Sequence, residues 1–290
     1  MIKPFVKWVG GKRQLINEIK ARLPEDYEER IHVEPFVGGG SVFLYLQPEK
    51  AYISDYNKEL MNAYIEVALE PKGLLSELNK MKNTKDDYYK YRDRYNSYLC
   101  KKCSLSSAIE EAALFIYLNK TGFNGMYRLN KQGLFNVPWN KNPHEDMTHF
   151  IHCEDLLGTS KYLKEHVSIG HPKSYALVYE VYNSSDYTYK HKQFWYLDPP
   201  YAPLDKDIER GNFDQYTTFT GWDHDEQVRL RDFCVKLHKT GHKFMLSNSS
   251  CTLIKDLYKD FKIEEVDARR SISAKASTRS GCKEVIVTNY

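Results

Sequence analysis

The sequence of 290 residues contains no apolar run long enough to cross a membrane, and its first residues form no apolar signal core. We therefore expect a protein with no membrane partner that stays in the cytoplasm, where thiols are reduced. The excess of positive over negative charge is also small, because the formal net charge is only +3. So small a net charge gives no argument for a nucleic-acid partner, and any such argument must come from the local distribution of charge.

The six cysteines form no repeated metal-ligand pattern. Cys100 and Cys103 make one C-x-x-C pair, but neither a second pair nor a spaced pair of histidines completes a zinc site. We therefore predict no bound metal. No cysteine follows a proline, although the nucleophile that attacks C5 of cytosine usually does, so methylation of cytosine at C5 is disfavoured.

An aromatic and apolar run stops abruptly at an acid, two prolines and a tyrosine. Residues 194–197 favour a buried strand, because a short apolar run bounded by proline is typical of one. Proline has no N–H to donate, so the strand should end at Asp198, and open α/β sheets place ligands at such ends. A strand end with a tight turn needs no function, however, so this segment gains weight only from the other motifs. The catalytic candidates are Asp198, Pro199, Pro200 and Tyr201.

These four residues suit methylation of an exocyclic amino group on a nucleobase. The N6 atom of adenine is a weak nucleophile because its lone pair is delocalised into the ring. The Asp198 carboxylate and the Pro199 carbonyl can accept both amino hydrogens, which stabilises the positive charge that develops as the nitrogen attacks a methyl sulfonium. The ring of Tyr201 offers a stacking surface to a base extruded from a duplex.

Two further strand ends predict a nucleotide-like ligand. Residues 31–34 favour a strand, and the glycines from Gly38 to Gly40 then allow the backbone to approach a ligand at the start of a helix. No third glycine stands at the spacing of a dinucleotide fold, which counts against a dinucleotide. Asp55 ends a second strand, where an acid typically accepts hydrogen bonds from ribose hydroxyls; a helix cap is an alternative that is compatible with this role.

Residues 60–145 change from a helical pattern to a basic and aromatic one. No acidic residue occurs between Glu111 and Glu145, and basic residues alternate there with aromatic ones: Lys120, Arg128, Lys131 and Lys141 with Phe123, Tyr127, Phe135 and Trp139. Basic residues position phosphates, arginine can bind guanine, and an aromatic ring at a loop tip can insert into a base stack. We therefore predict a DNA-recognition hairpin at 119–139, with a solvated hairpin as the alternative.

Four other segments give weaker expectations. Residues 152–157 favour another strand end, at which Asp155 would contact an adenosine. The Tyr-rich segment 158–192 has poor periodicity, and an accessory hairpin is its default interpretation. The loop 202–222 is consistent with a lid over the site, and the basic loop 269–283 is a second candidate surface for a nucleic-acid backbone.

The motifs, in this order, resemble those of the Dam-type (class α, D12) DNA adenine-N6 methyltransferases of the GATC-type subgroup, over nearly the whole chain. The resemblance is carried by the segments 7–12, 34–40, 123–128, 135–138, 198–201, 246–248 and 287–290. It implies an α/β fold, with a Rossmann-like sheet of the S-adenosylmethionine-dependent methyltransferases and an inserted helical DNA-recognition domain. The catalytic domain would comprise 1–59 and 146–290, and the recognition domain 60–145.

Carried over by position, the resemblance and the motifs give two sets of expected contacts. The S-adenosylmethionine set is Trp8, Lys12, Glu34, Phe36, Gly38, Gly40, Asp55, Asp155 and Asp198. The double-stranded DNA set is Lys7, Phe123, Asn124, Arg128, Asn130 and Pro138. Within the second set, Lys7 and Arg128 would recognise the target sequence, and Phe123 would lie beside the flipped base.

The predicted function is site-specific transfer of a methyl group from S-adenosylmethionine to N6 of a flipped-out adenine, with GATC as the site that the resemblance implies. Methylation of cytosine at N4 stays an alternative because it uses the same amino-group chemistry, and so does a catalytically silent DNA-binding protein of the same fold. A protein-glutamine methyltransferase is disfavoured, because those enzymes resemble Asn-Pro-Pro-Tyr rather than Asp-Pro-Pro-Tyr. We expect a monomer on DNA, with a cognate restriction endonuclease as a candidate partner.

Overall fold

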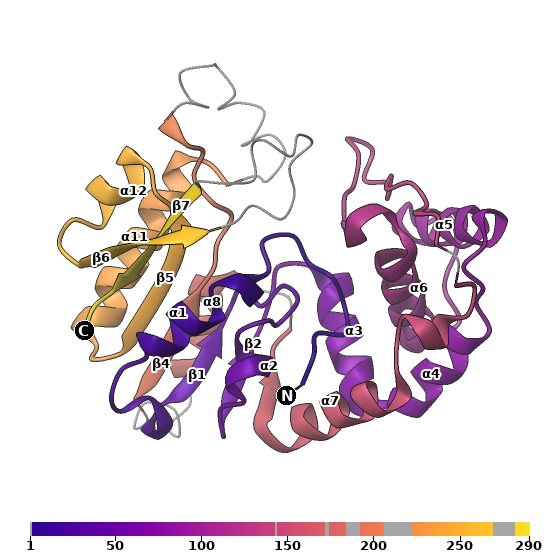
Figure 1. Cartoon of the computed structure of the whole chain (residues 1–290), viewed down its shortest axis with the longest axis horizontal. Helices are drawn as coiled ribbons and strands as arrows, with labels where there is room; N and C mark the ends of the chain where they lie inside the picture. The colour runs from indigo at the N-terminus through magenta and orange to yellow at the C-terminus, as the bar shows by residue number, and fades with distance from the viewer. Residues whose placement is uncertain (1, 143, 172–173, 184–191, 206–221, 269–281) are drawn as a thin grey trace. The chain divides into compact units, whose positions relative to one another are not determined.

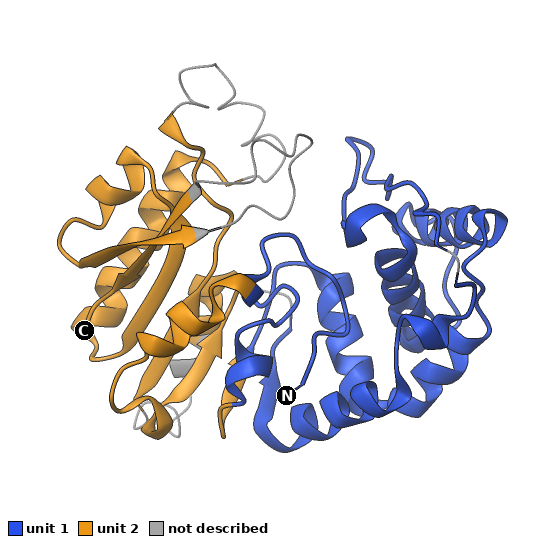
Figure 2. Cartoon of the chain, in the orientation of Figure 1, with its two compact units in different colours: residues 1–13, 37–47, 53–173 blue, residues 14–36, 48–52, 174–290 orange. Residues whose placement is uncertain are grey.

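The computed structural model describes residues 2–142, 144–171, 174–183, 192–205, 222–268 and 282–290 (Figure 1). The chain divides into two compact units (Figure 2). Unit 1 consists of residues 1–13, 37–47 and 53–173, and unit 2 of residues 14–36, 48–52 and 174–290. The predicted division at residues 59 and 145 concerns function rather than compactness, and it stays a prediction.

Seven strands of the described chain form one mixed sheet in the order β3-β2-β1-β4-β5-β7-β6. The strands are β1 (Ile31–Glu34), β2 (Ala51–Ile53), β3 (Val167–Ile169), β4 (Gln193–Leu197), β5 (Lys243–Ser249), β6 (Lys262–Ala268) and β7 (Cys282–Thr288). β4 runs parallel to β1 and β5, whereas β7 runs antiparallel to β5 and β6. The predicted α/β fold is confirmed. The strands expected at residues 31–34, before Asp55 and before the two prolines are also present, as β1, β2 and β4.

The central strand β4 ends where the sequence predicts. All five of its residues are buried, and Trp195 and Leu197 pack in the same core as Phe233. Phe194 belongs to the opposite face, where its ring lies edge-on to that of Tyr27 with 5.2 Å between centroids. Because the segment after Leu197 contains two prolines, the ladder cannot continue, and Asp198 follows at the carboxyl end of the strand.

The helices of unit 2 pack on this sheet. Within the described residues they are α1 (Ile16–Ala21), α8 (Tyr175–Asn183), α11 (His224–Lys239) and α12 (Thr252–Leu257). Asp223 begins α11 by accepting a hydrogen bond from the Glu226 N–H at 2.9 Å, which confirms the expected helix start. Leu230 and Leu237, seven residues apart on one face of α11, join the buried core.

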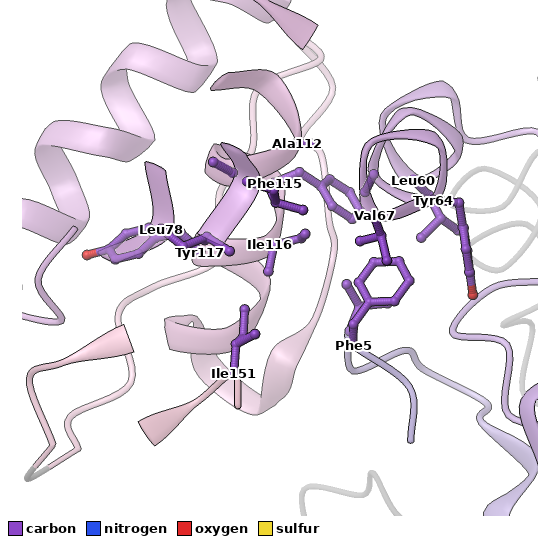
Figure 3. Packing of buried hydrophobic residues seen from close by; sticks show 14 of the residues in the cluster. Phe5, Leu60, Tyr64, Val67, Leu78, Ala112, Phe115, Ile116, Tyr117 and Ile151 are labelled. Carbon is purple, nitrogen blue, oxygen red and sulfur yellow. The ribbon is translucent and has the colours of Figure 1, made fainter. Parts of the chain in front are cut away.

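Unit 1 is helical around its own core. Its helices are α2 (Phe43–Leu46), α3 (Lys58–Leu69), α4 (Pro71–Asn79), α5 (Lys85–Leu99), α6 (Ala108–Thr121) and α7 (Cys153–His166), with short 3-10 turns at Lys12–Gln14, Phe123–Gly125 and Met147–His149. Side chains of α6 from 112 to 119 are all buried, and Figure 3 shows Phe5 of the N-terminal segment beside Val67 of α3. None of the described helices is long and apolar enough to span a membrane.

Two predictions of secondary structure are wrong. Residues 153–166 form helix α7, not a strand end at 152–157, because Leu156 and Leu163 stand at helical spacing and are both buried in the core of unit 1. The default of an accessory hairpin at 158–192 also fails, since α7 continues into β3 and the helix α8 follows. Residues 184–191, 206–221 and 269–281 lie outside the described part of the chain, and with them the greater part of the predicted lid and of the basic loop.

Candidate active site and recognition hairpin

Buried polar side chains hold the backbone that follows the two prolines in unit 2. Asn248 of β5 accepts a hydrogen bond from the Ala202 N–H at 3.0 Å and donates to Gln227 at 3.3 Å. Gln227 of α11 donates to the Pro200 carbonyl at 3.0 Å, and Ser249 donates to the Ala202 carbonyl at 2.7 Å. A buried network with every member paired specifies a single conformation, so the turn after Asp198 is rigidly placed.

The side chain of Tyr201 is fixed by a carboxylate on another strand. Its ring is partly buried, and its Oη donates a hydrogen bond to Glu284 Oε2 of β7 at 2.6 Å. Burial raises the pKa of Tyr201 well above its usual value, and the nearby charges of Asp198 and Glu284 raise it further. The phenol is therefore a neutral donor at physiological pH, and its ring has one orientation.

Tyr196 places a second neutral phenol close to Asp198. It is fully buried in β4, and its Oη lies 2.9 Å from Ser247 Oγ. Burial raises the pKa of Tyr196 well above its usual value, and the charge of Asp198 is the next cause of the shift. Asp198 itself is only partly buried.

The carboxyl end of β1 carries a buried hydrogen-bonded triad. Glu34 is 2% exposed, and its Oε2 lies 3.0 Å from His32 Nε2. Burial lowers the pKa of His32 to about 3, so the ring is neutral, and its Nδ1 lies 3.1 Å from Tyr27 Oη. The tautomer with the proton on Nε2 satisfies all three groups, because Nδ1 then accepts from the phenol. Glu34, which is predicted to contact the cofactor, is thus held by a neutral imidazole.

Phe36, the next predicted contact in unit 2, belongs to an aromatic group. Its ring centroid lies 5.6 Å from that of Tyr175 and 5.5 Å from that of Trp222, the latter edge-on. The side chain is partly buried, and these aromatic contacts hold its ring in place.

In unit 1, the glycine loop is shaped by contacts that only glycine permits. Gly38 has φ +48°, and a Cβ there would come 2.7 Å from Trp8 Cδ1. Gly40 has φ +70°, and a Cβ there would come 2.6 Å from Tyr64 Oη. The Gly38 N–H donates to Asp55 at 3.0 Å, and its carbonyl accepts from Tyr64 at 3.0 Å. Four of the residues predicted to contact the cofactor therefore lie together in this unit.

The carboxylate of Asp55 is positioned by backbone donors. Its Oδ2 accepts from Gly38 and its Oδ1 from the Asn57 N–H, both at 3.0 Å. Burial raises the pKa of Asp55, and these backbone hydrogen bonds oppose the rise. The alternative role as a helix cap belongs instead to Asn57, whose Oδ1 accepts from the Leu60 N–H at 2.8 Å. Each Asp55 oxygen keeps a lone pair for a further donor such as a hydroxyl.

Two other predicted cofactor residues differ in their surroundings. Lys12 is 5% exposed, and its Nζ donates to the Gly10 carbonyl at 2.6 Å. Asp155 lies in the first turn of α7, half exposed and 3.9 Å from Lys3 Nζ. The strand end that motivated the choice of Asp155 does not exist, so its contact with a cofactor stays a prediction without that support.

A hairpin is present in unit 1 at the predicted position, and its role in DNA recognition stays a prediction. Two isolated antiparallel bridges, Gly122 with Trp139 and Leu129 with Phe135, fold the chain back on itself. At the tip, Asn130 Oδ1 accepts from the backbone N–H groups two and four residues further on, at 3.0 and 2.9 Å. The predicted DNA contact Asn130 therefore shapes the turn with its oxygen, while its amide nitrogen makes no hydrogen bond to the described part of the chain.

The returning arm of the hairpin is anchored to α5. Asn96 accepts from the Phe135 N–H at 2.7 Å and donates to the carbonyl of the same residue at 3.1 Å. Tyr88, fully buried, donates to the Val137 carbonyl at 2.9 Å. The outgoing arm is thereby presented on a rigid support.

The predicted DNA contacts on the two arms of the hairpin are exposed or partly exposed. Phe123 is 45% exposed, Asn124 follows it with φ +55°, and exposed Pro138 accepts from the Phe123 N–H at 2.9 Å. Arg128 Nε donates to Asn136 Oδ1 at 2.7 Å. Within the described residues its two terminal nitrogens make no hydrogen bond, so the guanidinium presents a fork of donors.

Sequence reasoning missed Gln227 and Glu284. Gln227 is 2% exposed, three residues before Leu230 on the core-facing side of α11, and a polar residue at such a position was the available signal. Glu284 lies near the start of β7 between exposed Lys283 and buried Val285, where an ordinary partly exposed residue would also stand, so no local signal marks it.

Comparison with known proteins identifies the family. The protein-family model described as D12 class N6 adenine-specific DNA methyltransferase matches residues 8–272. The Type II methyltransferase M1.LlaDCHI of Lactococcus lactis subsp. cremoris is 37% identical over 292 residues, which cover 100% of this chain and 96% of that protein. M.MjaIII of Methanocaldococcus jannaschii is 36% identical, covering 100% and 99%. The DNA adenine methylase of Escherichia coli K12 is 29% identical, covering 98% and 94%.

The chain belongs to the D12 class of N6 adenine-specific DNA methyltransferases. It is an enzyme that acts on DNA and methylates adenine, as the sequence motifs predict. A reaction of this kind requires a methyl donor. The identity of the donor, the target sequence and the roles of single residues are matters of proposal.

Proposed function

We propose that the enzyme transfers the methyl group of S-adenosylmethionine to N6 of an adenine that is rotated out of duplex DNA, within the sequence GATC. The observation that carries the proposal is the buried network that fixes residues 200–202 directly after Asp198 at the end of β4, where Asp198 is only partly buried. S-adenosylmethionine, when bound, supplies a methyl group that a nitrogen nucleophile can accept.

Asp198 and Pro199 are the acceptors for the two hydrogens of the adenine amino group. The Pro200 carbonyl already accepts from Gln227, whereas the Pro199 carbonyl has no partner within the described residues. Asp198 and Pro199 together would raise the electron density on N6 and stabilise its developing positive charge. No histidine or lysine base is needed, because the methylated nitrogen becomes acidic and then releases its proton.

Tyr201 provides the surface on which the extruded adenine stacks. Its hydroxyl is committed to Glu284, so the ring does not need to be ordered when the base arrives. Extrusion costs a few kcal/mol of lost stacking and pairing, and a preformed aromatic wall offsets part of that cost.

The residues present fit S-adenosylmethionine. Asp55 offers a partly buried carboxylate to the ribose hydroxyls, and Lys12 offers an ammonium group to the amino-acid carboxylate. Trp8 and Gly38 shape the loop beside Asp55. Phe36 in unit 2 offers an aromatic face. We assign Glu34, Gly40 and Asp198 to the same set.

The hairpin carries the recognition of DNA. We propose that Arg128 donates from its two terminal nitrogens to a guanine edge and that exposed Phe123 fills the space left by the extruded base. Lys7 contacts a second base pair. Asn124, Asn130 and Pro138 complete the contact surface, and the enzyme acts on DNA as a monomer.

Two of the relatives are named Type II methyltransferases, so we propose that this enzyme belongs to a restriction-modification system with a cognate endonuclease. Methylated DNA would then resist that endonuclease. The alternative role is that of a solitary enzyme, and other relatives are named DNA adenine methylase, without mention of a type II system.

The test is transfer of tritiated methyl groups to unmethylated genomic DNA, followed by nucleoside analysis and single-molecule sequencing of the product. The proposal expects N6-methyladenine confined to GATC. N6-methyladenine at another sequence would contradict the GATC assignment. A matched synthetic duplex with GGTC in place of GATC should stay unmethylated, and N4-methylcytosine in it would contradict the adenine specificity.

A further inference from the structure

One buried side chain joins the N-terminal segment to the recognition hairpin. Asn119, in the last turn of α6, is 1% exposed. Its Oδ1 accepts from the Lys7 N–H at 2.8 Å, and its Nδ2 donates to the Lys7 carbonyl at 2.8 Å and to the Gly125 carbonyl at 2.9 Å. Both amide hydrogens and the amide oxygen are therefore used on backbone groups. A clamp of this kind fixes the position of Lys7 relative to the hairpin.

Gly125 completes the clamp by its lack of a side chain. It has φ +63°, and a Cβ at this position would come 2.4 Å from Lys7 Cβ and 2.5 Å from Lys7 Cδ. The aliphatic stem of Lys7 thus lies directly on the hairpin backbone. Any larger residue at position 125 would push the stem away, whatever Asn119 does.

The charge of Lys7 is directed to a region of positive charge. Burial and the nearby Lys7 ammonium together lower the pKa of Lys120 to about 8, so the two amines are close. No acidic residue occurs from 112 to 144 to neutralise them. An electronegative partner from outside the protein, such as a base edge of DNA, suits this position.

We propose that Asn119 is a positioning residue for sequence recognition, because it holds Lys7 against Gly125 and so directs the Lys7 ammonium to one base pair. The inference rests on the proposed function, in which Lys7 contacts a base. A lysine ammonium is a flexible point charge with no directional fork, so its selectivity depends on where its backbone is held. A released Lys7 would still attract phosphates, but it would lose its preference for one base pair.

The experiment compares kcat/KM for a GATC duplex with kcat/KM for duplexes that each carry one changed base pair. Wild type, Lys7→Ala, Asn119→Ala and Gly125→Ala are measured. The last variant keeps Asn119 and displaces the Lys7 stem, so it carries the test if Asn119→Ala fails to fold. Asn62→Ala is the matched control, because Asn62 in the same unit also donates to one backbone carbonyl, that of Ala108 at 3.0 Å.

We expect Asn119→Ala and Gly125→Ala to lose about tenfold or more of the discrimination at the base pair that Lys7→Ala relaxes. The kcat on GATC at saturating DNA should stay within about threefold, with discrimination at the Arg128 base pair retained. Adding Asn119→Ala to Lys7→Ala should relax nothing further. Asn62→Ala should match the wild type.

Folded variants that keep full discrimination, or that lose it equally at every base pair, would overturn the role of Asn119. A position relaxed by Asn119→Ala but not by Lys7→Ala would overturn it as well. A wild-type enzyme that methylates no adenine would instead refute the proposed function, so the two failures are distinguishable.

Discussion

The phenol of Tyr201 donates a hydrogen bond of 2.6 Å to Glu284, a contact between residues 83 positions apart in the sequence. The last residue of the Asp-Pro-Pro-Tyr segment is thereby oriented by β7, while Gln227 and Asn248 hold the backbone on either side of it. The candidate catalytic segment is therefore held from three elements of unit 2: β5, β7 and α11.

Replacing Glu284 by alanine should free the ring of Tyr201. We expect kcat to fall about tenfold or more, because an unanchored ring must be ordered each time a base is extruded. In Glu284→Gln the kcat should fall less, since an amide oxygen still accepts a hydrogen bond from the phenol. The fluorescence of 2-aminopurine at the target position should report weaker stacking in the same order. Equal activity in the alanine variant and the wild type would contradict the anchoring role.

Gln227→Leu should loosen the turn after Asp198. The substitution removes the donor to the Pro200 carbonyl. It also removes the acceptor for the buried amide nitrogen of Asn248, and together these losses cost about 1–3 kcal/mol in the free energy of unfolding. Methyl transfer should fall by more than binding of DNA does. Urea denaturation and methylation assays check this. Val228→Ala, one position along the same helix, is the control and should leave methyl transfer near the wild-type rate.

Glycine substitutions should act in opposite directions at two sites of unit 1. Gly40→Ala forces a Cβ to within 2.6 Å of Tyr64 Oη at a positive φ, so the protein should be destabilised. Gly158→Ala lies within α7 and meets nothing within 4 Å, so it should stabilise by about 0.5–1 kcal/mol. Thermal unfolding distinguishes the two. A stabilising Gly40→Ala would show that the loop geometry is wrong.

The free energy of unfolding should fall as the pH falls from about 6.5. Burial lowers the pKa of His32 to about 3 and that of His242 to about 4. Over this interval the unfolded state binds more protons than the folded state, so stability is present above the unfolded pKa and is lost as the pH decreases.

Urea titrations at several pH values test this prediction through its slope. Each buried neutral histidine contributes up to about 1.4 kcal/mol per pH unit. His32→Gln should remove one such contribution between about pH 6 and pH 4, even if the variant is less stable overall. A slope identical to that of the wild type would mean that His32 takes up a proton in the folded state.

The sequence was sufficient to predict the structure where a local rule decides it without help from distant contacts. Two prolines after an apolar run forbid a continuing ladder, so the end of β4 at Leu197 and the placement of Asp198 after it were predictable. The glycine turn and Asp55 were predictable for the same reason, since positive φ and a strand end leave local marks.

Prediction failed where the outcome depended on distant contacts. Residues 152–157 are too few to distinguish a strand from the start of a helix, and burial of Leu156 and Leu163 in the core decided for α7. Glu284 reaches Tyr201 only because β7 enters the sheet beside β5, and Asn119 reaches Lys7 across 112 residues. No local pattern encodes such pairings.

The most direct test of the central claim is methyl transfer by wild type and Asp198→Ala on one GATC duplex, with tritiated S-adenosylmethionine and nucleoside analysis of the product. DNA affinity is measured on the same preparations. We expect N6-methyladenine from the wild type, a loss of transfer by at least about 10²–10³-fold in the variant, and little change in affinity. Unchanged turnover in Asp198→Ala would contradict the account, because the carboxylate would then not act on the amino group.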